Sequence, residues 1–78
     1  MPRYHFHVES SAGVSGDVDG RDLQDDASAV KEAGSCAGEV LMDEITSGIE
    51  CPRVVVTVER SDGSKTATVT ANAQVEVH

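Results

Sequence analysis

Apolar residues recur with the period of an α-helix along one long stretch of the chain, residues 26–47. At 100° per residue, these side chains gather in one broad sector of the helix and the polar ones lie opposite. The sector contains Ala29, Val30, Ala33, Cys36, Ala37, Val40 and Leu41. The pattern predicts an amphipathic helix with a buried side, capped by Asp25 or Asp26 and ended by Gly48.

Three residues interrupt this helical pattern, and each interruption has two interpretations. Glu44 projects into the apolar sector. Either the helix end passes the sheet edge and the carboxylate reaches water, which we expect, or a buried carboxylate has a specific partner. Gly34 and Gly38 each disfavour a helix by about 1 kcal/mol relative to alanine. We expect them to let the helix backbone approach the sheet closely; the alternative is a helix–helix contact between two copies.

Strict alternation of apolar and polar residues predicts a strand at residues 4–9. Tyr4, Phe6 and Val8 share its buried face, and the other face carries His5, His7 and Glu9. Val14 and Val18 indicate a short second strand. Leu23 is expected to plug the core where the chain enters the helix.

Two β-prone segments, residues 53–60 and 65–72, flank the turn signal Asp62-Gly63. A two-residue turn pairs Ser61 with Ser64 and sorts the hairpin into an apolar and a polar face. The apolar pairs are Val54 with Ala71, Val56 with Val69 and Val58 with Ala67. The other pairs are Glu59 with Thr66, Thr57 with Thr68 and Val55 with Thr70.

These elements predict a single α+β domain over residues 1–78, because 78 residues form one small core. The order β-β-α-β-β and a right-handed crossover give an antiparallel sheet, order 2-1-3-4, with the helix packed on one face. Residues 73–78 alternate again and are expected to extend the last strand or to form a mobile tail.

The net charge is −8, from 6 Lys and Arg against 14 Asp and Glu. This balance argues against binding nucleic acid or an anionic membrane, which both attract basic proteins. No apolar run reaches the length of a membrane-spanning helix and no signal peptide precedes the first strand, so we expect a cytoplasmic protein. Cys36 and Cys51 are too far apart for a disulfide, and we expect two free thiols.

The acidic residues before the helix invite a calcium interpretation, which their spacing contradicts. An EF-hand loop that starts at Asp17 needs glycine at position six and glutamate at position twelve. Here Gly20 comes fourth and Ser28 comes twelfth. We therefore expect a solvated acidic loop with helix-capping aspartates.

Two histidines on one strand face are the only candidate for metal chemistry. His5 and His7 place their imidazoles about 7 Å apart, and they would bind zinc if a third ligand such as Glu9 or His78 joined them. No third ligand follows these histidines at a spacing typical of a zinc site. The sequence has no nucleophile elbow, phosphate loop or paired His/Cys motif, so we expect no enzyme and no cofactor.

The opening Met-Pro-Arg-Tyr-x-Phe-His-Val, the run Asp-x-x-Gly-x-Asp-Leu from Asp17 to Leu23 and the Ala-rich helix resemble a family of small uncharacterised bacterial proteins. The family is known only as a domain of unknown function, so the resemblance implies a fold and no chemistry. The leading hypothesis is a non-catalytic protein-interaction or regulatory module that binds a protein partner or itself as a homodimer. The alternative is a metal-binding protein that uses His5 and His7.

Overall fold

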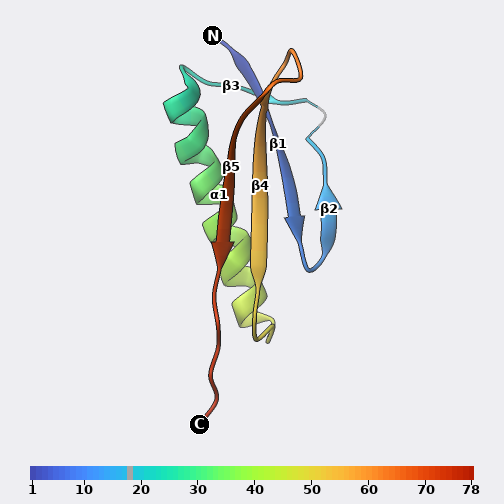
Figure 1. Ribbon diagram of the computed structural model, residues 1–78, viewed down its shortest axis with the longest axis vertical. Coiled ribbons are helices and arrows are strands. Elements are labelled where there is room, and N and C mark those ends of the chain that lie inside the picture. The colour runs from blue at the N-terminus through green and yellow to red at the C-terminus, as the bar shows by residue number, and fades with distance from the viewer. Residues whose placement is uncertain (18) are drawn as a thin grey trace.

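The computed structural model describes residues 1–17 and 19–78, and it consists of one helix packed against one antiparallel sheet (Figure 1). The elements are β1 (Arg3–Ser10), β2 (Gly13–Ser15), β3 (Arg21–Asp22), α1 (Asp26–Thr46), β4 (Arg53–Arg60) and β5 (Lys65–Asn72). The sheet follows the path β2-β1-β4-β5, and β3 also pairs with β1. The α+β class is confirmed, and the four expected strands lie in the expected order. Only the two-residue β3 was not predicted.

The core lies between α1 and one face of the sheet. Its buried apolar residues are Tyr4, Phe6, Ala29, Ala33, Ala37, Val54, Val56 and Val58. The helix contributes only alanines to this set, so its backbone lies close to the valine-rich strands. Leu23 packs against the core from its edge, as predicted. Two aromatic residues therefore suffice to fill the core, because the close approach of α1 leaves little space between the helix and the sheet.

Both predicted ends of α1 are confirmed. The Asp25 carboxylate accepts the Ser28 backbone N–H at 2.8 Å, which satisfies one free donor of the first turn. At the other end Gly48 follows the C-cap residue Ser47 with φ +92°, a conformation that favours glycine. Among the described residues, no helix combines the length and apolar composition needed to cross a membrane.

The β4–β5 hairpin keeps its predicted apolar register but closes differently. The Arg60 N–H donates to the Ser64 carbonyl at 2.9 Å, so the turn has one more residue than expected and Ser61 does not pair with Ser64. Glu59 then pairs with Lys65 instead of Thr66. A register shift between Val58 and Glu59 absorbs the extra residue, and the apolar pairs follow as predicted.

The edge of β1 away from β4 carries β2, which is shorter and more exposed than a core strand. Val14 in β2 is 77% exposed, so it contributes little to the core. Val18, the other residue predicted for this strand, lies outside the described residues.

Residues 73–78 leave the sheet at the end of β5 and continue along its direction (Figure 1). The N–H groups of Ala73 and Val75 donate to the carbonyls of Pro52 and Glu50 at 3.2 and 2.8 Å. These bonds prolong the pairing of β4 and β5 beyond the assigned strands. The first half of the segment is therefore anchored by its backbone.

Candidate functional site

The structure places the two predicted metal ligands on the sheet face opposite α1, and each has its own partner. His5 Nδ1 lies 3.0 Å from the carbonyl oxygen of Asp17. His7 Nε2 lies 3.2 Å from a carboxylate oxygen of Glu59 on β4. The two imidazoles therefore point to different neighbours.

No third ligand joins these histidines within the described part of the chain. Groups of three or more His, Cys, Asp or Glu residues in metal-binding proximity are absent among residues 1–17 and 19–78. The C-terminal residue His78 lies at the end of the tail, which runs away from the end of the sheet where β1 starts (Figure 1). It contacts Glu76 at 3.7 Å instead.

Both cysteines are free thiols, as predicted, with Cys36 half-buried and Cys51 exposed. Burial raises the pKa of the Cys36 thiol, and the carboxylate of Glu39 raises it further. A raised pKa lowers the thiolate fraction on which nucleophilic chemistry depends.

The acidic Gly turn serves the fold directly, so the prediction of a merely solvated loop is wrong for Asp17. β2 and β3 pair with opposite ends of β1 and leave a gap at Phe6. The Asp17 carboxylate fills this gap: it accepts the Phe6 N–H at 3.2 Å and the Gly20 N–H at 3.0 Å. Burial raises the pKa of Asp17, but these hydrogen bonds outweigh it and leave the pKa below its ordinary value.

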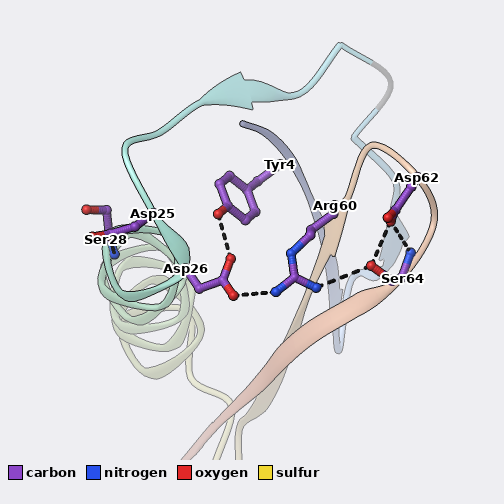
Figure 2. A network of polar contacts seen from close by, with 7 residues as sticks. All are labelled: Tyr4, Asp25, Asp26, Ser28, Arg60, Asp62 and Ser64. Carbon is purple, nitrogen blue, oxygen red and sulfur yellow. Dashed lines mark hydrogen bonds and ion pairs between the residues drawn. The ribbon is translucent and has the colours of Figure 1, made fainter. Parts of the chain in front are cut away.

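A polar network ties the start of α1 to the sheet (Figure 2). The Tyr4 hydroxyl donates to Oδ1 of Asp26 at 2.6 Å, and the Arg60 guanidinium pairs with Oδ2 of the same carboxylate. Arg60 also donates to the Ser64 hydroxyl in the β4–β5 turn at 3.3 Å. Asp26 thus joins α1 to β1 and β4, and it satisfies the hydroxyl of Tyr4, a residue that is only 1% exposed.

We expect this network to weaken in acid. Hydrogen bonds from Tyr4 and Arg60 lower the pKa of the Asp26 carboxyl. A depressed folded-state pKa contributes stability above the unfolded pKa of about 3.9, and this contribution is lost as the pH falls through the folded pKa. The wild type should therefore lose more stability between pH 6 and pH 3 than Asp26→Asn, measured by urea unfolding.

Comparing the wild type with Asp26→Asn separates the contribution of this one carboxylate to stability from that of the other charged groups. Relief of the −8 self-repulsion on acidification acts on both proteins almost equally. An equal loss in both proteins would contradict a stabilising role for ionised Asp26.

Glu44 is buried, so the expectation that its carboxylate reaches water is wrong. The residue is 6% exposed, and its Oε1 accepts the backbone N–H of Ser11 at 2.9 Å and the Ser11 hydroxyl at 2.6 Å. These hydrogen bonds lower the pKa of the carboxyl. Glu44 therefore fastens the β1–β2 turn to the end of α1. The helical pattern had located an unusual residue, but Ser11 carries no sequence signal as its partner.

Gly34 and Gly38 are exposed, and a Cβ added at either would meet nothing within 4 Å. The prediction that they let α1 approach the sheet closely is therefore wrong, because the buried alanines make that contact. The glycines belong to one side of α1, which we call the α1 flank. It consists of Val30, Lys31, Gly34, Gly38, Leu41 and Met42. Val30, which the helical pattern placed in the buried sector, is 41% exposed, and Met42 is 59% exposed.

The free edge of β5 is the longest unpaired strand edge of the described molecule. β5 has 8 residues and ends the sheet path, and no other described strand pairs with its outer side. The bonds of Ala73 and Val75 point toward the β4 side. By alternation, the backbone groups of Thr68, Thr70 and Asn72 point outward.

The fold defines a small α+β domain, a helix-backed antiparallel sheet with one long open edge. A family model described as Domain of unknown function (DUF6894) matches residues 3–72. The chain therefore belongs to this family, which confirms the resemblance to an uncharacterised-domain family. The match ends at Asn72, the last residue of β5. Comparison with curated proteins found no match, and comparison with solved structures found none.

Proposed function

We propose that this protein is a non-catalytic protein-interaction or regulatory module that binds its partner at the outer edge of β5. The observation that carries the proposal is the composition of that edge. Lys65 is the only charged residue of β5, and the strand contains neither proline nor glycine. Natural proteins usually protect such edges with charges, proline or short length, because an open edge readily pairs with another strand.

The structural use of three acidic side chains supports a non-catalytic role. Asp17, Asp26 and Glu44 hold backbone turns or neighbouring side chains through hydrogen bonds. Metal binding through His5 and His7 stays a prediction. We do not adopt it as the function, because each imidazole already has a different protein partner.

Site-specific photo-cross-linking in cells that express the protein tests this proposal. A photo-reactive residue in place of Thr70, on the outer edge, should yield a covalent protein adduct. A second substitution, Thr68→Pro, should remove the adduct, since proline lacks the N–H that a partner strand needs. The same photo-reactive residue in place of exposed Ser35 on α1 is the control. Absence of an adduct at position 70 would contradict the proposal.

A further inference from the structure

The two long sides of α1 differ in charge, and they face different parts of the sheet. One side carries Glu32 and Glu39 and, with Phe6 and Arg21, lines a crevice of about 310 Å³. Arg21 on β3 also forms an ion pair with Glu32. This side therefore faces the β1 edge of the sheet.

The α1 flank consequently lies on the β5 side. Figure 1 shows α1 and β5 at the same side of the molecule, with β1 and β2 at the other. Leu41 of the flank and Val69 of β5 both pack against the core at its margin. The open edge of β5 and the α1 flank thus form one lateral surface, which we call the β5–α1 face.

The β5–α1 face contains no carboxylate, although the chain has 14 Asp and Glu residues. Its only charged residues are Lys31 and Lys65. Two copies, each with a net charge of −8, would therefore meet here without opposing their acidic groups. The rest of α1 bears Asp26, Glu32, Glu39, Asp43 and Glu44.

We propose that the partner at the open edge is a second copy of this chain, which forms a two-fold dimer through the β5–α1 face. This inference rests on the proposed function and names its partner. A two-fold axis perpendicular to the sheet beside β5 pairs the two β5 strands antiparallel and keeps both helices on the same face. The same rotation places one α1 flank against the other. A strand from an unrelated protein would fill the edge and leave the flank exposed.

The glycines fit this arrangement, and no contact within one copy requires glycine at either position. Each disfavours the helix by about 1 kcal/mol relative to alanine, and the space beside each is open. In the dimer, small side chains at this contact allow the two helix axes to lie closer together, because the distance between packed helices depends on the side chains between them. The outward backbone groups of Thr68, Thr70 and Asn72 in one copy would also pair with the same groups of the second copy, because the two β5 strands run antiparallel.

The test is the solution mass of the full chain by sedimentation equilibrium, with two variants on α1. The wild type should have twice the monomer mass of 8.2 kDa. Gly34→Glu places like charges across the two-fold axis and should raise the dimer dissociation constant roughly 100-fold or more. Ser35→Glu, on the exposed neighbouring position outside the face, should leave it unchanged within about threefold.

We expect Gly34→Glu to fold normally. It removes a helix-disfavouring glycine, and the introduced glutamate side chain points into open space. Circular dichroism should show an intact helix. Thr70→Pro, which removes an outward N–H of β5, should weaken the dimer independently.

A dimer that resists Gly34→Glu would overturn the inference, and so would a monomeric wild type at high micromolar concentration. If that monomer still forms the adduct at position 70 with another protein, only the identity of the partner is wrong; without that adduct, the proposed function fails as well.

Discussion

Phe6→Ala is expected to remove a large part of the stability of this protein. Phe6 is 9% exposed and lies in the centre of β1, where it pairs with Val58 of β4 and belongs to the buried core. Truncation of a buried phenylalanine to alanine costs roughly 3–5 kcal/mol. A chain of 78 residues has a total unfolding free energy of roughly 4–12 kcal/mol. Urea unfolding followed by circular dichroism should therefore show a strongly lowered midpoint or no folded baseline.

Val14→Ala provides the control for this result. Val14 is 77% exposed on β2, and its truncation should change the unfolding free energy by no more than about 0.5 kcal/mol. If Phe6→Ala cost as little as Val14→Ala, the core would not lie where the structure places it.

Gly20→Ala is expected to be the second most damaging of these changes, at roughly 2–5 kcal/mol. Gly20 has φ +76°, and a Cβ there would lie 2.9 Å from the carbonyl oxygen of Tyr4 and 2.9 Å from His5 Cε1. The Tyr4 carbonyl belongs to β1 and cannot move without disturbing the sheet. Thermal unfolding should show a melting temperature lowered by about 8 °C or more.

Gly63→Ala separates the backbone conformation from the close contact. Gly63 has a similar φ of +89°, but a Cβ there would meet nothing within 4 Å. Its replacement should cost only the conformational term, roughly 1–2 kcal/mol. Equal losses for Gly20→Ala and Gly63→Ala would show that the approach of Gly20 to β1 is unimportant.

Local patterns in the chain were sufficient to derive most of the fold. The alternation of Tyr4, Phe6 and Val8 predicted the buried face of β1, and the alanine spacing predicted the buried side of α1. These predictions succeeded because period and burial are properties of a single segment. The apolar pairing of β4 with β5 followed because a one-residue slip would expose the valines.

The sequence did not reveal the contacts that fasten these segments together. Tyr4 and Asp26 are 22 residues apart, and Arg60 lies a further 34 residues along the chain. Ser11 and Glu44 are separated by 33 residues. No local period relates such pairs, because their proximity depends on how the helix and strands pack.

Gly34 and Gly38 show most clearly the difference between what a local pattern predicts and what packing decides. Helical periodicity places both glycines on one side of α1, but it contains no information about what lies beside that side. The packing of α1 on the sheet turns the acidic side toward Arg21 and leaves the glycines next to the open edge of β5. A helical pattern defines a face, and only the three-dimensional arrangement of the neighbouring elements defines what that face meets.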